Sequence, residues 1–278
     1  MKLALAQIEV EPTAVDANVD RAVDAIETAA ADGADLVALP ELFNVGFFAF
    51  DAYQRLAEPL GGETHQRLRD AAADTDVGVL AGSIVEDLGE TATRADAGEI
   101  DSIDVPAQEG LSNTSVFFDR AGDRQAIYRK HHLFGYESQE TQLLTAGDAL
   151  GSFDFEGFTV GMTTCYDLRF PELYRALLDE GVTLTLVPSA WPYPRVEHWE
   201  TLPRARAIEN LAYVATINGS GEFADATLCG RSTVYDPWGT TIASSDDDPT
   251  IVTATIDPGR VDSVRGEFPA LRDRRFTQ

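Results

Sequence analysis

The chain has 278 residues, and its 21 basic and 47 acidic side chains give a formal net charge of −26. A negative field of this size repels phosphate backbones and anionic membrane surfaces. The composition therefore excludes nucleic acid and the membrane as expected partners. A chain of this length also buries enough apolar surface to fold around a full hydrophobic core.

The sequence carries no run of about 18 apolar residues, and the N-terminal stretch MKLALAQIEVEPT becomes acidic before a signal peptide could form. Two cysteines in 278 residues fit free thiols in a reducing compartment better than a disulfide framework. We therefore expect a cytoplasmic protein.

Lysine is almost missing from the chain. Lys2 and Lys130 are the two lysines, and the other basic residues are arginine. A surface rich in acid and poor in lysine is typical of a halophilic protein, because concentrated salt screens its self-repulsion. The retention of Lys130 against this bias suggests a function, although chance survival explains it as well.

Hydrophobic periodicity predicts one α/β domain over residues 1–278, with strands and helices alternating and several hairpins between them. No linker rich in Pro, Gly and Ser divides the chain, and no repeat has a fixed period. The expected strands are 2–10, 35–40, 77–85, 112–119, 125–133, 158–165, 183–190 and 213–219, followed by a hairpin at 230–244, and the expected helices are 18–34, 64–75, 171–181 and 199–212.

Two segments lie outside this alternation. Residues 87–111 are rich in acid, Gly and Ala, which predicts a solvated loop or hairpin insertion without chemistry of its own. Residues from about 258 to 278 form a C-terminal extension.

Three polar side chains follow predicted strands, where active-site groups of α/β proteins gather. Glu41 follows 35–40, Lys130 ends the second strand of a hairpin, and Cys165 stands between a strand and a helix. A thiol at such a bend lies near free backbone N–H groups, which can stabilise an oxyanion. Taken singly, Cys165 also fits a small buried hydrophobe and Glu41 a solvated loop carboxylate.

Three motifs in this order resemble the signatures of the nitrilase superfamily of carbon–nitrogen hydrolases. They are LPELF around Glu41, YRKHHLF around Lys130 and TTCYDLRFPELYRAL around Cys165. The resemblance extends over nearly the whole chain, including SAWPYPRVEHWETLPRARAIENLAYVATING. It implies a four-layer α-β-β-α sandwich that assembles into homodimers or larger homo-oligomers through helical faces.

The resemblance also implies the role of each residue. Glu41 is the general base, Lys130 the electrostatic partner and Cys165 the nucleophile, which forms a thioester with an amide substrate. The backbone N–H of Tyr166 is an oxyanion donor. Glu140 matches the second glutamate frequent in the family, with Glu137 as the alternative.

The segment around residues 191–195 offers a substrate contact. Trp191 and Arg195 follow a predicted strand, and an arginine binds a carboxylate with two hydrogen bonds. The alternative is a loop packed by its aromatic side chains. Asp167 and Arg169 are interpreted as a structural ion pair that fixes the bend after Cys165, with substrate contact as the alternative.

The remaining candidates are assigned no catalytic role. Cys229 has no base or lysine near it in sequence and is expected to fill space. His131 and His132 are adjacent and would point to opposite faces of a strand, which argues against a shared metal ion. We expect no metal and no cofactor.

Within the superfamily, CYDLRFPE resembles the amidase branch rather than the nitrile-cleaving enzymes, and the segments PELFNVGF and WPYPRVEHWETLPRARAIEN are similar to omega-amidases. The resemblance implies hydrolysis of a short dicarboxylic acid monoamide, with Arg195 on the far carboxylate. A nitrilase or an N-carbamoyl amidohydrolase is the alternative. A Cys-His hydrolase that uses His131 or His132 and a non-enzymatic assembly subunit are further alternatives.

Overall fold

Two β-sheets lie face to face in the computed structural model, which describes residues 1–101, 103–136, 138–223 and 226–276. Within these ranges the first sheet has seven strands and the second has six. In the order of pairing, the first sheet contains β15 (Thr250–Thr255), β1 (Lys2–Gln7), β2 (Leu36–Ala38), β3 (Gly78–Leu80), β5 (Leu111–Phe118) and β4 (Ile84–Asp87), with β6 (Arg124–Arg129) also paired to β5. The second contains β14 (Thr241–Ser244), β13 (Thr233–Tyr235), β10 (Tyr213–Asn218), β9 (Leu184–Ser189), β8 (Phe158–Met162) and β7 (Gly151–Phe155).

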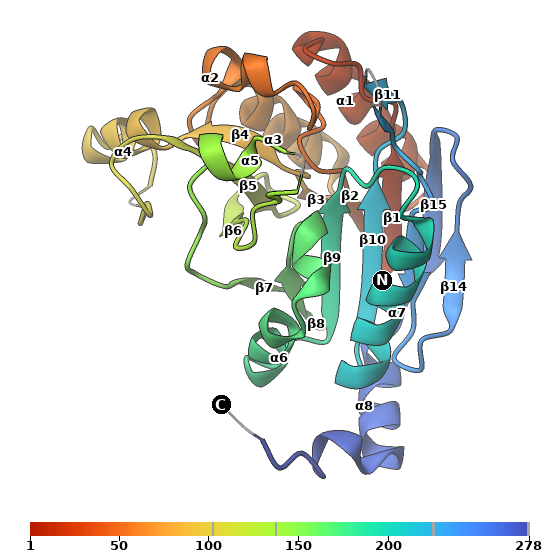
Figure 1. Cartoon of the computed structure of the whole chain (residues 1–278). Coiled ribbons are helices and arrows are strands. Elements are labelled where there is room, and N and C mark those ends of the chain that lie inside the picture. The colour runs from red at the N-terminus through yellow and green to blue at the C-terminus, as the bar shows by residue number, and fades with distance from the viewer. Residues whose placement is uncertain (102, 137, 224–225, 277–278) are drawn as a thin grey trace.

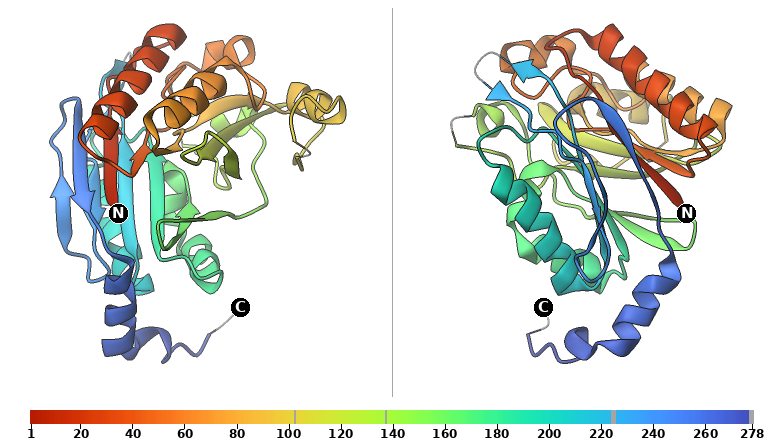
Figure 2. Two further views of the ribbon diagram at one scale, coloured as in Figure 1. Left: turned by 180° about the vertical axis from the view of Figure 1, so that it is seen from behind. Right: turned by 90° about the vertical axis from the view of Figure 1, so that its right-hand side faces the viewer.

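Helices cover the outer face of each sheet, so the molecule has four layers (Figures 1 and 2). On the first sheet lie α1 (Val15–Ala31) and α3 (Glu63–Thr75), and on the second lie α6 (Pro171–Asp179) and α7 (Val196–Asn210). The expected α-β-β-α sandwich is confirmed. The shorter elements are α2 (Tyr53–Leu56), α4 (Leu88–Asp96), α5 (Glu140–Leu143), α8 (Pro258–Glu267), the 3-10 helices η1 (Phe50–Ala52), η2 (Cys165–Arg169) and η3 (Pro269–Leu271), and the small hairpin of β11 (Glu222–Phe223) and β12 (Ala226–Thr227).

The central core lies between the two sheets. Leu5 and Phe117 from the first sheet belong to the same buried cluster as Met162, Leu186 and other apolar residues of the second. Separate clusters join each sheet to its own helices. Apolar side chains on both faces of the strands explain the nearly continuous hydrophobic runs of the sequence.

Parallel strands at the centre of each sheet place the functional loops. β1, β2 and β3 run parallel in the first sheet, and β8, β9 and β10 run parallel in the second. Glu41 comes shortly after β2, Cys165 after β8 and Ala190 directly after β9. The carboxyl ends of parallel strands therefore supply three loops of the site.

Three expectations of local structure need correction. The strand expected at 77–85 is split into β3 and β4, because Gly82 has a φ of +50° and a Cβ there would lie 2.1 Å from the carbonyl oxygen of Pro40. The segment 87–111 contains the helix α4, whose N-cap Asp87 accepts a hydrogen bond from the N–H of Glu90. Helix α7 begins at Val196 and keeps Pro203 inside it.

The C-terminal segment folds as α8 and η3, below the second sheet in Figure 1. Asp257 caps α8 by accepting a hydrogen bond from the N–H of Gly259. In the described ranges, no helix has both the length and the apolar character needed to cross a membrane.

Candidate active site

A buried ion-pair cluster joins the loop after β2, the residue after β6 and the start of α5. The ammonium Nζ of Lys130 donates to Glu41 Oε1 at 2.9 Å and to the two carboxylate oxygens of Glu140 at 2.9 and 3.0 Å. All three side chains have no exposed surface. Two carboxylates around one ammonium balance the charge that burial would otherwise make costly.

Backbone and amide groups fix the two carboxylates. Glu41 Oε2 accepts a hydrogen bond from the N–H of Ala190 at 2.9 Å, and Glu140 Oε2 accepts one from the N–H of Phe134 at 2.6 Å. Asn113 Nδ2 donates to Oε1 of both residues, at 2.8 Å for Glu41 and 3.2 Å for Glu140. Glu137, the alternative second glutamate, lies outside the described residues.

Sequence reasoning missed Asn113, although the sequence carried a signal for it. Asn113 lies on β5, and its carbonyl oxygen accepts a hydrogen bond from the N–H of Lys130 at 2.9 Å. The predicted hairpin of 112–119 and 125–133 already pairs these two positions. An amide side chain on a strand beside a buried lysine donates to the same carboxylates as that lysine.

Cys165 begins η2, directly after the loop that follows β8. Its φ is +47°, a left-handed conformation that is strained in a residue other than glycine and is often found at functional sites. The side chain is almost fully buried, with 8% of its surface exposed. The next residue, Tyr166, lies in the first turn of η2, where backbone N–H groups lack a partner within the helix.

The electrostatics place the thiol between the base and the cation. Burial, and then the negative charge of Glu41, raises the pKa of Cys165 well above its usual value, whereas the Lys130 ammonium and the backbone N–H of Ala190 lower it. The sulfur is therefore a neutral thiol at rest, and the Glu41 carboxylate is the negative charge that acts on it most strongly.

The pKa of Lys130 is raised as well. Burial alone would lower it, but the negative charges of Glu140 and Glu41 outweigh burial, so the ammonium stays protonated. Burial, opposed by Lys130 and reinforced by Glu41, raises the pKa of Glu140. The cluster thus keeps a fixed positive charge beside the thiol.

The expected pair of Asp167 and Arg169 does not form in the described part of the chain. Asp167 is fully buried and accepts hydrogen bonds from the Tyr128 hydroxyl and the backbone N–H of His132. Arg169 lies at 3.2 Å from His198 Nδ1 and packs on the rings of Tyr166 and Trp191. The expected ion pair is therefore wrong, and two of the groups that bind Asp167 come from the loop around Lys130.

The two histidines follow β6 in a bend rather than lying on opposite faces of a strand. The ring of His131 stacks on Tyr128, with 5.3 Å between the ring centres. His132 stacks on Phe170 and places Nδ1 at 2.7 Å from Asp167 Oδ1. Both rings are engaged away from the thiol, whose charged neighbours are Glu41 and Lys130.

A small pocket opens onto Cys165. Its empty space is about 340 Å³. Phe134 and Trp191 supply aromatic walls, and Arg169 and Arg195 supply two cations. The Arg195 guanidinium lies 5.6 Å from the centre of the Phe134 ring. The backbone carbonyl oxygen of Arg195 accepts a hydrogen bond from Trp191 Nε1 at 2.9 Å. The structure thus places Trp191 and Arg195 in the lining of this pocket, and their contact with a substrate stays a prediction.

Cys229, the second free thiol, is fully buried and accepts a contact from Asn218 Nδ2 at 3.5 Å. Burial raises its pKa to about 12. Its surroundings are those of a thiol that fills space.

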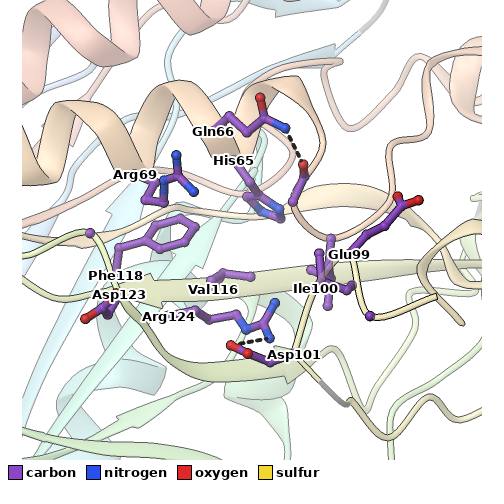
Figure 3. A pocket seen from close by; sticks show the side chains of 14 residues that line it. His65, Gln66, Arg69, Glu99, Ile100, Asp101, Val116, Phe118, Asp123 and Arg124 are labelled. Carbon is purple, nitrogen blue, oxygen red and sulfur yellow. Dashed lines mark hydrogen bonds and ion pairs between the residues drawn. The ribbon is translucent and has the colours of Figure 1, made fainter. Parts of the chain in front are cut away.

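A wider pocket lies away from the cluster, between α3, β5, β6 and the segment 98–101 (Figure 3). Its cations already have carboxylate partners, since Arg124 pairs with Asp101 and Arg69 with Asp70. The buried ring of His65 faces it, and burial lowers the pKa of this imidazole to about 4. The wider pocket therefore holds no free cation or activated nucleophile among these residues.

The fold matches solved structures of the nitrilase superfamily. Nit3 from Saccharomyces cerevisiae, a member of branch 10 of that superfamily, matches with a TM-score of 0.84 and 29% identity over 99% of this chain and 97% of its own. A mutant amidase from Nesterenkonia sp. AN1, in which acrylamide has undergone Michael addition at the active-site cysteine, matches with a TM-score of 0.80 and 25% identity over 96% of this chain and 97% of its own.

Sequence comparison gives the family. The carbon–nitrogen hydrolase family model matches residues 2–266, so the chain belongs to this family. The 2-oxoglutaramate amidase of Paenarthrobacter nicotinovorans is 37% identical over 87% of this chain and 79% of its own length. Omega-amidase NIT2 of Homo sapiens is 34% identical over 99% of this chain and 95% of its own length. The expected enzyme class, a carbon–nitrogen hydrolase of the nitrilase superfamily, is confirmed.

Proposed function

We propose that the chain hydrolyses the amide of a short dicarboxylic acid monoamide through a thioester on Cys165, with Glu41 and Lys130 completing the catalytic triad. One observation carries the proposal. The buried Lys130 ammonium is held between the carboxylates of Glu41 and Glu140, and the Cys165 thiol, on which the charges of Glu41 and Lys130 both act, lines a pocket that also contains Arg195.

The first half-reaction makes the thioester. Glu41 accepts the thiol proton while the sulfur of Cys165 bonds to the amide carbon, and the carbonyl π electrons move onto oxygen. Lys130 and the backbone N–H of Tyr166 stabilise the resulting oxyanion. The carbon–nitrogen bond then breaks, nitrogen takes the proton held by Glu41, and ammonia leaves.

The second half-reaction restores the enzyme. Glu41 deprotonates a water molecule, whose oxygen attacks the thioester carbon through a second oxyanion. The carbon–sulfur bond breaks, the carboxylic acid product is released as carboxylate, and the sulfur regains a proton. Glu140 touches Lys130 through both oxygens and holds the ammonium in place throughout.

The size and the charge of the pocket favour this substrate class. The pocket beside Cys165 is narrow and has aromatic walls, Phe134 and Trp191 among them, which suits a small amide rather than a peptide. Arg195 offers a planar pair of donors to a second carboxylate. The names of the relatives, omega-amidase and 2-oxoglutaramate amidase, agree with this assignment.

Ammonia release at high salt tests the proposal on succinamate, 2-oxoglutaramate, carbamoyl amines and simple nitriles. We expect the two dicarboxylic monoamides to be the best substrates. Arg195→Gln should raise the KM for succinamate about tenfold or more and leave butyramide, which lacks the second carboxylate, unchanged. A preference for nitriles or carbamoyl amines, or no turnover of any compound, would replace this function with one of its alternatives.

We also propose a homo-oligomer in a reducing, salt-rich cell interior. Exposed apolar side chains gather at the outer end of the second sheet, where Trp238 contacts Phe268 with 5.4 Å between ring centres and Ile208 packs over Gly239. Such a group of exposed apolar residues is common at interfaces between subunits. Sedimentation at high salt measures the assembly directly, and a monomer at micromolar concentration would contradict it.

A further inference from the structure

Asp167 lies at the junction between the loop that carries the nucleophile and the loop that carries the lysine. It stands two residues after Cys165, within η2, and has no exposed surface. Its hydrogen-bond partners lie on both of these loops. Thr164 belongs to the nucleophile loop, whereas Tyr128 and His132 stand two residues before and two residues after Lys130.

Each carboxylate oxygen of Asp167 has two donors. Oδ1 accepts from the backbone N–H of His132 at 3.0 Å and faces His132 Nδ1 at 2.7 Å. Oδ2 accepts from the Tyr128 hydroxyl at 2.6 Å and from the backbone N–H of Thr164 at 2.9 Å. A carboxylate with two lone pairs on each oxygen is the side chain that satisfies four donors in this arrangement.

Ring stacking joins the same two loops in addition to the hydrogen bonds of Asp167. The His132 ring stacks on Phe170, with 3.7 Å between ring centres and 7° between planes, and Phe170 directly follows η2. Tyr128 also accepts a hydrogen bond from the N–H of His131 at 3.4 Å. The backbone on both sides of Lys130 is thus fastened to the turn that begins with Cys165.

We propose that Asp167 is a positioning residue that sets the separation of the Cys165 sulfur and the Lys130 ammonium. It touches neither the substrate pocket nor the reacting atoms. It acts by holding the two loops in one relative position. Catalysis is sensitive to this position, because a displacement of about 1 Å costs up to about a hundredfold in rate. This inference rests on the proposed roles of Cys165 and Lys130.

Asp167→Asn tests the inference with almost no change of shape. Whichever way the new amide is turned, its NH₂ group faces a backbone N–H, that of His132 or that of Thr164, and one buried donor is left unpaired. We expect kcat for succinamate at high salt to fall about tenfold to a hundredfold, with KM changed less than about threefold. Tyr128→Phe, which removes one donor to Oδ2, should lower kcat by a smaller factor at constant KM.

Asp236→Asn is the matched control. Asp236 is also a buried turn carboxylate, whose Oδ1 accepts from the N–H groups of Trp238 and Thr240, but it lies in the hairpin of β13 and β14. This variant should lose thermal stability and keep its kcat. The folded fraction of every variant is measured by circular dichroism, and rates are expressed per folded molecule.

The outcomes separate this inference from the proposed triad. If Asp167→Asn and Tyr128→Phe lose stability but keep the wild-type kcat, Asp167 is merely structural and the inference is wrong. If Asp167→Asn does not fold, an unchanged kcat in Tyr128→Phe overturns the inference on its own. Lys130→Ala reports on the triad independently, since its full activity would refute the triad whatever the Asp167 variants do.

Discussion

Replacing Lys130 with methionine separates what the ammonium does for the fold from what it does for the reaction. The side chain keeps its approximate length and loses its charge, while Glu41 and Glu140 stay in place. Each has an oxygen 2.9 Å from Nζ, so these two oxygens are at most about 6 Å apart. At an effective dielectric constant of about 20, two unit charges at this separation repel by roughly 3 kcal/mol.

We therefore expect Lys130→Met to lose about 3 to 5 kcal/mol of stability, the usual range when one partner of a buried ion pair is removed. The loss should depend on pH. Burial and Glu41 already raise the pKa of Glu140 in the presence of Lys130, and removal of the cation raises it further. When the pKa of a carboxyl is higher in the folded protein than in the unfolded chain, its stabilising contribution is fully present below the pKa of the unfolded chain. That contribution is lost as the pH rises through the pKa of the folded protein. The deficit of the variant should therefore grow above about pH 5.

Denaturant unfolding from pH 5 to 8 measures this deficit, and ammonia release measures activity. The double variant Lys130→Met, Glu140→Gln removes one carboxylate charge and should regain much of the stability. Neither variant should recover activity, and loss of the oxyanion donor alone predicts a fall in kcat of at least about a hundredfold. A folded Lys130→Met that keeps kcat within about tenfold of the wild type would refute the role of this cation.

Three other predictions follow from the same structure. Because burial and Glu41 raise the pKa of Cys165, the rate of alkylation by iodoacetamide should rise continuously with pH through about pH 9. Glu41→Gln should be alkylated faster than the wild type while losing turnover. A plateau of the alkylation rate near neutral pH would indicate a thiolate–imidazolium pair instead. His131→Asn and His132→Asn should retain turnover within about tenfold of the wild type, and a dead histidine variant in the same ammonia assay would support the Cys-His alternative. Because the net charge is −26, the Tm should fall when KCl is lowered from about 1 M to about 0.1 M, where the Debye length grows from about 3 to about 10 Å, and a Tm independent of salt would contradict the halophilic interpretation.

The strands could be predicted because their signal is local, whereas the four layers were expected from the family resemblance. Alternation and apolar runs mark β5, β8 and β9 directly in the sequence, and the structure places them where expected. Glu41, Lys130 and Cys165 could be proposed because strand ends are visible in the sequence. Parallel strands bring the ends at Glu41 and Cys165 together, whereas Lys130 follows β6, which runs antiparallel to β5. The family motifs then gave these positions their expected roles.

What could not be predicted depends on groups that meet across loops. The partner of Asp167 was expected two residues away at Arg169, but two of its real partners, the Tyr128 hydroxyl and the N–H of His132, stand more than thirty residues away. Gly82 divides an apolar run that looks like one strand, and the carbonyl oxygen of Pro40 in a neighbouring segment leaves no room for a side chain at this position. Periodicity carries no information about such contacts.

The two lysines of the chain show why one of them is expected to be irreplaceable by arginine. Lys2 Nζ contacts the backbone carbonyl of Asp32 near the surface, a site that a longer side chain can also reach. Lys130 is enclosed by Glu41, Glu140 and the Phe47 ring, whose centre is 5.3 Å from Nζ. A compact ammonium donates in three directions, whereas a guanidinium is larger and donates within one plane.

Lys130→Arg keeps the charge and changes the shape, so it tests geometry alone. We expect overpacking to lower the stability by about 1 to 3 kcal/mol and kcat to fall by at least about a hundredfold, because the planar group cannot serve both carboxylates and the oxyanion. Lys2→Arg is the matched control and should retain the wild-type kcat. Ammonia release from succinamate measures both variants at high salt. Full activity of Lys130→Arg would show that a positive charge of either shape is sufficient for catalysis. The retention of Lys130 in a lysine-poor chain would then have no catalytic reason.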